Sequence, residues 1–226
     1  MVTANRSRVV VVGAGQVGSA VASAIMLQGL CNELVIINHN PEKARGLAMD
    51  LADGSEFFGR FVSVRRGDWD DCSSADVIVV TVGPRPVEGR NRLDGLAAAV
   101  DIVDPVLEQI KESGFNGILI MVSNPVDVLS WYAWKRTGLP RAQVIGSGTA
   151  LDTSRMKTII GETTGLDPRT VSGYVIGEHG DSQFIPWSTV TFVGKSFEQF
   201  LADNPGRYPG ATLKGIEEAT RRRGDE

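Results

Sequence analysis

Apolar and polar positions along the first two thirds of the chain follow a pattern in which strands and helices alternate. Short runs of branched aliphatic residues predict strands, and apolar residues that recur every three or four positions predict helices. The predicted strands are Val9–Val12, Leu34–Ile37, Phe61–Val64, Val77–Val82, Gly117–Val122 and Val144–Ile145. The predicted helices between them include a long one from about Arg92 to Glu112 and another over Val126–Lys135. Apolar strands alternating with amphipathic helices predict a parallel sheet covered on both faces.

The pattern changes from Leu151 onward and indicates a second unit. There we predict a helix, two strands and a Pro- and Gly-rich turn before a charged helix, at Thr153–Ile160, Val171–Ile176, Val190–Val193 and Asn204–Gly210. We therefore predict an α/β protein with two domains, residues 1–147 and 148–226. The first is a doubly wound parallel sheet of the Rossmann type, and the second is an α+β domain.

Composition and charge exclude several classes of protein. The 226 residues are 42% hydrophobic and 22% charged, which is typical of a globular protein. A net charge of −4 provides no basic field for nucleic acid. No apolar stretch reaches the roughly 20 residues of a membrane-spanning helix, and the N-terminus does not resemble a secretory signal. We expect a cytoplasmic protein with no membrane or nucleic-acid partner, with Cys31 and Cys72 as reduced thiols and no metal site.

A glycine-rich loop follows the first predicted strand and opens the next helix. Its sequence is Gly13-Ala14-Gly15-Gln16-Val17-Gly18. In a dinucleotide-binding fingerprint of this spacing, the first glycine allows a tight turn, the second lets a pyrophosphate approach, and the third lets the helix pack closely on the strand. Such glycines also occur in plain structural turns, but the position between a strand and a helix favours a nucleotide site.

An amide stands where the same fingerprint expects an acid. The expected carboxylate lies about 20 positions after the glycines, at the end of the second strand, where it accepts hydrogen bonds from the ribose. This chain has Asn38 there. An amide oxygen can accept the same bonds, but it does not repel a 2′-phosphate. Because Lys43 and Arg45 are expected on the exposed face of the next helix, we expect NAD, with weaker discrimination against NADP.

One of the two histidines, His179, lies in a loop after an apolar run, where catalytic groups are common. A lone histidine is more often structural, so its sequence neighbours decide its interpretation. Three segments together closely resemble the lactate/malate dehydrogenase family: Asn124-Pro125-Val126-Asp127, Gly146-Ser147-Gly148-Thr149-Ala150-Leu151-Asp152-Thr153-Ser154-Arg155 and Gly177-Glu178-His179-Gly180-Asp181-Ser182. The resemblance extends from Arg8 to the end of the chain.

This resemblance implies an NAD-dependent L-2-hydroxy-acid dehydrogenase and a role for each matched residue. His179 matches the proton donor and acceptor, and Asp152 matches the carboxylate that orients the imidazole. Asp152 stands just before a predicted helix, so a simple N-cap is its alternative. Arg155 matches the arginine that binds the substrate carboxylate through two hydrogen bonds. Arg92 matches the arginine of a loop that closes over the substrate, and a solvated residue in the first turn of a helix is its alternative.

The resemblance also implies which residues contact the cofactor and the substrate. Asn124 matches a residue that contacts the substrate or the nicotinamide, and Val122 and Ser147 match positions that line the nicotinamide pocket. The complete set expected to bind NAD is Gly13, Gly15, Gln16, Val17, Gly18, Asn38, Thr81, Val82, Gly83, Val122, Asn124 and Ser147.

The segment between Gly83 and Arg92 leaves the substrate open. Counting back from Arg92 places Pro86 where lactate enzymes of the family have glutamine and malate enzymes have arginine. A second substrate carboxylate needs a cation, so malate is disfavoured unless Arg85 takes that place. The segment Ser182–Val190 looks more like the L-2-hydroxyisocaproate dehydrogenases. We therefore expect an L-lactate dehydrogenase-like enzyme for pyruvate or a bulkier apolar analogue, with a malate dehydrogenase as the alternative.

The length of the chain adds a third possibility. Two domains of about 150 residues each would total about 300, and family members continue with further strands and a C-terminal helix. We therefore expect the second domain to be incomplete at its C-terminus, and a homo-oligomer, dimer or tetramer, for the full length. A nucleotide-binding module without catalytic activity is the alternative from another functional class.

Overall fold

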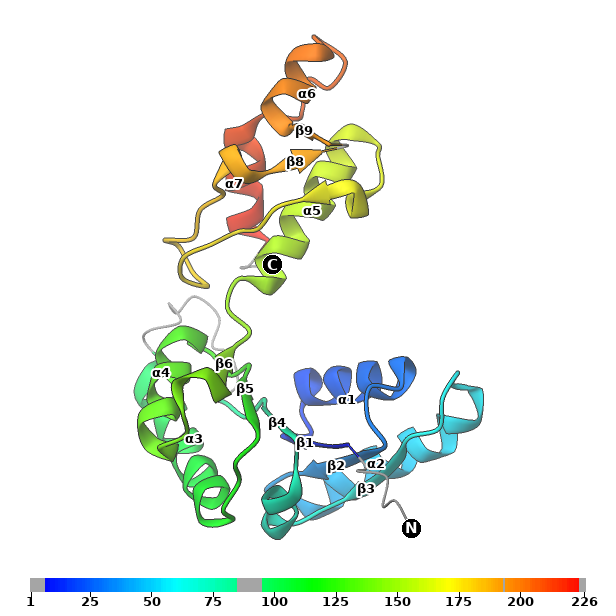
Figure 1. Cartoon of the computed structure of the whole chain (residues 1–226), viewed down its shortest axis with the longest axis vertical. Helices are drawn as coiled ribbons and strands as arrows, with labels where there is room; N and C mark the ends of the chain where they lie inside the picture. Colours follow the sequence, from blue (N-terminus) through cyan, green and yellow to red (C-terminus); the bar gives the residue numbers. More distant parts are fainter. Residues whose placement is uncertain (1–6, 85–94, 193, 224–226) are drawn as a thin grey trace. The chain divides into compact units, whose positions relative to one another are not determined.

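The computed structural model describes residues 7–84, 95–192 and 194–223. The chain divides into two compact units, residues 1–146 and 147–226. Figure 1 labels most of their helices and strands, numbered in sequence order. Each unit has its own sheet and its own apolar core.

Six parallel strands form the centre of the first unit (Figure 1). Their order across the sheet is β3-β2-β1-β4-β5-β6. The strands are β1 (Arg8–Val12), β2 (Glu33–Ile37), β3 (Ser63–Arg66), β4 (Val77–Val80), β5 (Ile118–Met121) and β6 (Val144–Gly146). The order reverses between β1 and β4, and doubly wound sheets bind ligands at the carboxyl ends of the strands beside such a reversal.

Helices cover both faces of this sheet, as the alternation of buried valines in β1 requires. Val9 and Val11 belong to the apolar core formed with two of the helices, α1 (Gln16–Gln28) and α2 (Pro41–Gly54). Val10 and Val12 belong to the core formed with the other two, α3 (Leu96–Glu112) and α4 (Val126–Thr137). The doubly wound parallel sheet predicted from the sequence is therefore confirmed.

Several predicted boundaries in this unit were wrong. The strand predicted at Phe61–Val64 is found two residues later, as β3, and Phe61 is exposed. The error arises because β3 pairs with only one strand and carries Arg65, whose guanidinium binds Glu33 and Asp71. Strand β4 also ends earlier than predicted, at Val80.

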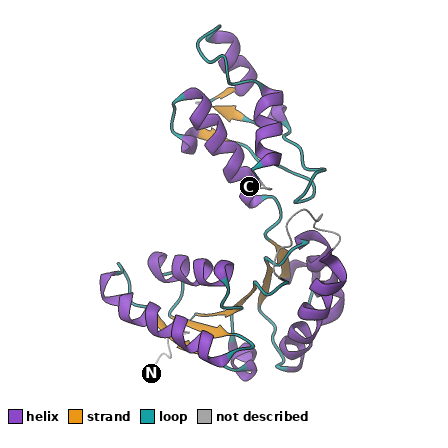
Figure 2. Ribbon diagram, turned by 180° about the vertical axis from the view of Figure 1, so that it is seen from behind, coloured by secondary structure: helices purple, strands orange, loops and turns teal. Residues whose placement is uncertain are grey.

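The second unit combines helices with a small sheet, whose strands are orange in Figure 2. The sheet is antiparallel, in the order β7-β8-β9. Its elements are α5 (Ala150–Thr164), β7 (Val171–Ser172), β8 (Thr191–Phe192), β9 (Lys195–Ser196), α6 (Phe197–Asp203) and α7 (Leu213–Arg222). Met156, Ile160, Phe192, Phe197 and Ile216 contribute to the core on which these elements pack. The predicted α+β character is confirmed.

Two predictions in this unit were wrong. The strand expected over Val171–Ile176 is only two residues long, because Gly173 adopts a φ of 148° and turns the chain out of the ladder. Helix α5 extends beyond both ends of the predicted Thr153–Ile160. Helix α6 was not predicted, and it begins at Phe197, a buried residue that follows the N-cap Ser196.

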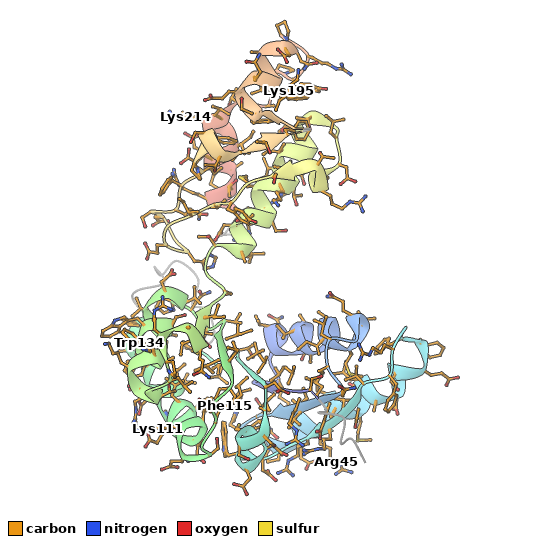
Figure 3. The ribbon with its side chains drawn as sticks, viewed as in Figure 1. Arg45, Lys111, Phe115, Trp134, Lys195 and Lys214 are labelled. Carbon is orange, nitrogen blue, oxygen red and sulfur yellow. The ribbon has the colours of Figure 1, made fainter. Side chains whose placement is uncertain are left out.

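Short 3₁₀ helices connect several of these elements, at Ser55–Phe57, Trp69–Ser74, Arg141–Gln143, Pro168–Thr170 and Trp187–Thr189. Figure 3 shows the side chains on the ribbon, with Phe115 and Trp134 among those labelled in the first unit. Both belong to the core beneath α3 and α4, with Phe115 buried and Trp134 partly buried at the margin. Within the described ranges no helix is long and apolar enough to cross a membrane.

Candidate active site

The glycine loop between β1 and α1 needs glycine at two of its three fingerprint positions. Gly13 has a φ of 114°, and a Cβ added there would lie 2.6 Å from the Thr81 hydroxyl oxygen. A Cβ added at Gly18 would overlap the carbonyl oxygen of Gly13. Gly18 thus allows α1 to begin directly against the strand end, as the fingerprint predicts.

The third glycine faces open space at the start of α1. A Cβ built on Gly15 meets no atom within 4 Å. Gly15 is the N-cap of α1, and the first turn of the helix contains no acidic residue. The first N–H groups of a helix lack internal partners and attract anions. This part of the loop therefore fits a pyrophosphate through backbone N–H groups, with Gln16 and Val17 as the first helical residues.

Asn38 connects the end of β2 to the glycine loop. Its side-chain oxygen accepts a 3.1 Å hydrogen bond from the Ala14 N–H, and its side-chain nitrogen donates a 3.1 Å bond to the Asn40 carbonyl. Asn38 therefore orders the loop in addition to being the residue at the expected ribose position. Lys43 and Arg45 are exposed, as predicted, and Arg45 is labelled in Figure 3.

The other residues expected near the cofactor follow the carboxyl ends of strands. Thr81 comes after β4, and its hydroxyl donates a 3.1 Å bond to the Val12 carbonyl beside the glycine loop. Val122 comes after β5, and its N–H donates to the Val80 carbonyl at 3.0 Å. The structure thus gathers the glycine loop, Asn38 and Thr81 at one sheet edge. Val82, Gly83 and the exposed Asn124 lie two or three residues beyond the ends of β4 and β5. Ser147 begins the second unit, and Pro86 and Arg92 lie outside the described residues.

The second unit brings His179 and Asp152 into direct contact. The His179 Nδ1 lies 2.5 Å from the Asp152 Oδ2, and the two side chains are 8% and 1% exposed. Asp152 lies in the first turn of α5. The N-cap of that helix is Thr149, so the alternative role of Asp152 as the N-cap was wrong.

The other carboxylate oxygen of Asp152 binds an arginine. The Arg155 Nη1 lies 3.2 Å from the Asp152 Oδ1, one helical turn away. Burial of the Asp152 carboxyl raises its pKa. The hydrogen bond and charge of His179 and the charge of Arg155 together lower the pKa by a larger amount. The pKa of Asp152 therefore lies below its usual value. An ionised Asp152 accepts hydrogen bonds only, so the Nδ1 of His179 carries the proton in this pair.

His179 sits in a short loop whose two ends are joined. Ile176 and Phe184 exchange two backbone hydrogen bonds of 3.0 Å each. Gly177 turns the chain with a φ of 96°. The Ser182 hydroxyl donates a 2.6 Å bond to the Glu178 carboxylate across the loop. These bonds limit how far the loop, and therefore the imidazole, can move.

Two threonines at the start of α5, the N-cap Thr149 and the helical Thr153, contact the same segment, and neither was among the predicted site residues. The Thr149 hydroxyl donates a 2.6 Å bond to the Val175 carbonyl, and the Val175 N–H donates a 3.0 Å bond to the Thr153 hydroxyl. Their spacing of four residues, with Asp152 between them, places them near one helix face and was the available signal.

Two family models match adjoining parts of the chain. The model described as the NAD binding domain of lactate/malate dehydrogenase matches residues 7–146. The model described as the alpha/beta C-terminal domain of lactate/malate dehydrogenase matches residues 149–226.

Known proteins agree with these models. L-lactate dehydrogenase 1 of Bifidobacterium longum is 58% identical over 226 residues, which are all of this chain and 72% of that protein. A lactate dehydrogenase from a Medee basin deep-sea metagenome has a TM-score of 0.89 and 41% identity, covering 96% of this chain and 69% of its own. The lactate dehydrogenase of Cryptosporidium parvum, solved with lactic acid and nicotinamide adenine dinucleotide, has a TM-score of 0.87 and 29% identity, covering 96% and 68%.

Proposed function

Because the chain belongs to the lactate/malate dehydrogenase family, we propose that its Asp152–His179 pair is the acid/base of an L-lactate dehydrogenase reaction. The chain is an NAD-dependent oxidoreductase of the L-lactate dehydrogenase type, acting on 2-hydroxy acids. The observation that carries the assignment of the pair is the 2.5 Å contact between His179 and the buried carboxylate of Asp152.

The proton chemistry follows from this contact. With Nδ1 donating to Asp152, the Nε2 of His179 is the nitrogen that exchanges a proton with the substrate oxygen. Reduction of a keto carbon leaves an oxyanion, which a protonated imidazole stabilises and then neutralises. In the reverse direction the neutral imidazole removes the hydroxyl proton.

Arg155 is proposed to bind the carboxylate of the substrate. A guanidinium presents paired N–H donors that match both oxygens of a carboxylate. The 3.2 Å contact between Arg155 and Asp152, one helical turn apart, holds the guanidinium beside the carboxylate that is proposed to orient His179. Asn124 is proposed to contact the substrate or the nicotinamide. The roles of Arg92 and Pro86 in covering and selecting the substrate remain proposals based on the family resemblance.

The cofactor is NAD, which supplies or accepts the hydride when it is bound. The proposed binding residues are those of the glycine loop, which offer backbone N–H groups to the phosphates, and Asn38, which offers an amide to the ribose. Thr81, Val82, Gly83, Val122 and Ser147 complete the proposed site. The open space at Gly15 supports this assignment.

We propose pyruvate as the preferred substrate, because the similar proteins are lactate dehydrogenases. The test is the initial rate of NADH oxidation with pyruvate, 2-ketoisocaproate and oxaloacetate under the same conditions. The highest kcat/KM with pyruvate supports the proposal. The highest value with 2-ketoisocaproate or with oxaloacetate would replace it with a branched-chain or a malate enzyme.

We also propose that the full-length protein forms a homo-oligomer, a dimer or tetramer, in the cytoplasm. Large apolar side chains are exposed around the end of α1 and after α2, namely Leu27, Leu30, Phe57 and Phe61. Exposed apolar groups of this size often mark contacts between proteins. Light scattering after gel filtration tests the assembly, and a monomer at micromolar concentration would contradict it.

A further inference from the structure

We propose that Thr149 and Thr153 are positioning residues that fasten the segment carrying His179 to the helix carrying Asp152. The inference deepens the proposed function and rests on the role of His179 in it. The hydrogen bonds that carry this inference join the two threonine hydroxyls to the backbone of Val175, and not to His179 or Asp152.

Together the two threonines satisfy both backbone polar groups of Val175. The Thr149 hydroxyl donates to its carbonyl at 2.6 Å, and the Thr153 hydroxyl accepts from its N–H at 3.0 Å. Val175 is 1% exposed, so water does not replace these bonds readily. In a strand, a neighbouring strand would satisfy these groups. Here Gly173 has turned the chain out of β7, and two side chains of α5 satisfy them instead.

The threonine hydroxyls are used differently from others in the same helix. Thr149 is the N-cap of α5, a position at which a threonine usually bonds to its own helix, yet its side chain makes no capping bond. Later in α5, the hydroxyls of Thr158, Thr163 and Thr164 each donate to the carbonyl four residues earlier. Thr149 and Thr153 are directed toward another segment, which indicates a specific connection.

The connection lies close to the acid/base pair. Asp152 immediately precedes Thr153 on α5, and His179 is four residues after Val175. Between them, Ile176 is paired with Phe184, so the loop that carries the imidazole is closed at its base. Fastening Val175 to α5 therefore fixes the base of that loop relative to Asp152. Proton transfer depends strongly on such geometry, and a misplacement of about 1 Å can cost roughly 100-fold in rate.

The experiment replaces each hydroxyl with a methyl group of similar volume. Thr149→Val and Thr153→Val are expected to lower kcat for pyruvate by roughly 10- to 100-fold. The KM for pyruvate and the Kd for NADH are expected to remain within about twofold, because Arg155 and the glycine loop keep their contacts. Thr149→Ser and Thr153→Ser retain the hydroxyl and are expected to retain most of kcat.

Thr164→Val is the matched control. Thr164 is also buried in α5, but its hydroxyl donates a 2.7 Å hydrogen bond to the Ile160 carbonyl of the same helix. Thr164→Val should lower the free energy of unfolding in urea about as much as Thr153→Val does. The kcat of Thr164→Val should stay near that of the unmodified chain. An equal fall of kcat in Thr164→Val would show that general destabilisation explains the effect, and the proposal would be wrong.

A proton NMR measurement separates this proposal from the proposed function. The Nδ1 proton of His179, shared with Asp152, should give a strongly downfield resonance that shifts or disappears in both valine variants and persists in the serine variants. If no keto acid is turned over by any of these proteins but the resonance behaves in this way, the positioning role stands and the proposed function fails. If the valine variants keep both the resonance and kcat, the positioning role fails.

Discussion

The two units of the chain hold their proposed ligands by different means. In the first unit, the groups suited to a dinucleotide are mainly backbone N–H groups in a glycine loop, at the carboxyl ends of strands whose central members are buried on both faces. In the second unit, the proposed reactive groups are the side chains of Asp152, Arg155 and His179, joined by contacts of 2.5 Å and 3.2 Å.

Because of this difference, the two sites are sensitive to different kinds of substitution. A site built from backbone is damaged by an added side-chain atom, because the space beside the backbone is already used or must stay open. A site built from ionisable side chains is damaged by removing a charge or a donor, even where the shape is conserved. Substitutions that keep the shape but alter the charge, and substitutions that do the reverse, therefore distinguish the two units.

The largest effect is expected from His179→Asn, which keeps a donor near Asp152 but removes the titratable imidazole. We expect kcat for pyruvate reduction to fall roughly 10³-fold, the range of general acid/base catalysis. The Kd for NADH, measured by fluorescence titration, should change little because the glycine loop lies in the other unit. Turnover at the unmodified rate would remove His179 from the mechanism.

The next largest effect is expected from Arg155→Lys, which keeps the positive charge of the second unit but removes the planar pair of donors. We expect the KM for pyruvate to rise roughly 100-fold, since a lysine cannot form the paired bonds to a carboxylate. Steady-state kinetics over a wide pyruvate range measures this change. A KM that stays constant would show that Arg155 does not bind the substrate carboxylate.

In the first unit, Gly18→Ala tests the opposite weakness, since it adds one carbon and no charge. The new Cβ would overlap the Gly13 carbonyl oxygen, so the loop or α1 must move. We expect a destabilisation of about 1–3 kcal/mol in urea unfolding, as for other overpacked sites, and weaker NADH binding. Gly46→Ala is the control, because a Cβ there meets no atom within 4 Å in an exposed part of α2.

A smaller effect is expected from Asn38→Asp, which adds a charge to the first unit at almost constant shape. Its carboxylate can still accept the Ala14 N–H, but it would repel the 2′-phosphate of NADPH. We expect the ratio of the NADPH Kd to the NADH Kd to rise about tenfold. If the ratio does not change, Asn38 does not contact that part of the cofactor.

The smallest effect is a dependence of stability on pH that comes from the second unit. Because the pKa of Asp152 is lower in the folded chain than in the unfolded one, its ionised form stabilises the fold above about pH 4. This contribution is lost as the pH falls through the folded-state pKa. The difference in unfolding free energy between the unmodified chain and Asp152→Asn, measured in urea, should therefore shrink below about pH 4.

The comparison also explains what the sequence predicted well. The inner strands β1, β2 and β4 of the first unit are largely buried on both faces, so each appears as an apolar run. Val9–Val12 and Leu34–Ile37 were located within one residue of β1 and β2. Their carboxyl ends then located the glycine loop and Asn38. The edge strand β3 was misplaced because its arginines make ion pairs and give no apolar signal.

The structure of the second unit was harder to predict because it depends on the contacts and backbone conformation of single residues. The contact between Asp152 and His179 joins residues 27 positions apart and was expected only from the family resemblance. The strand at Val171–Ile176 fails at one glycine, Gly173, although its residues favour a strand. The hydrogen bonds between Val175 and the hydroxyls of Thr149 and Thr153 follow from that turn of the chain, and only the four-residue spacing of the two threonines could have indicated them.

The most direct test of the central claim is the reaction of the unmodified chain with pyruvate and NADH, followed by analysis of the product. We expect one L-lactate for each NADH oxidised, with the D-enantiomer absent. If the chain binds NADH but oxidises it with none of the 2-keto acids tested, the result would contradict the claim that this chain carries out the reaction with Asp152 and His179.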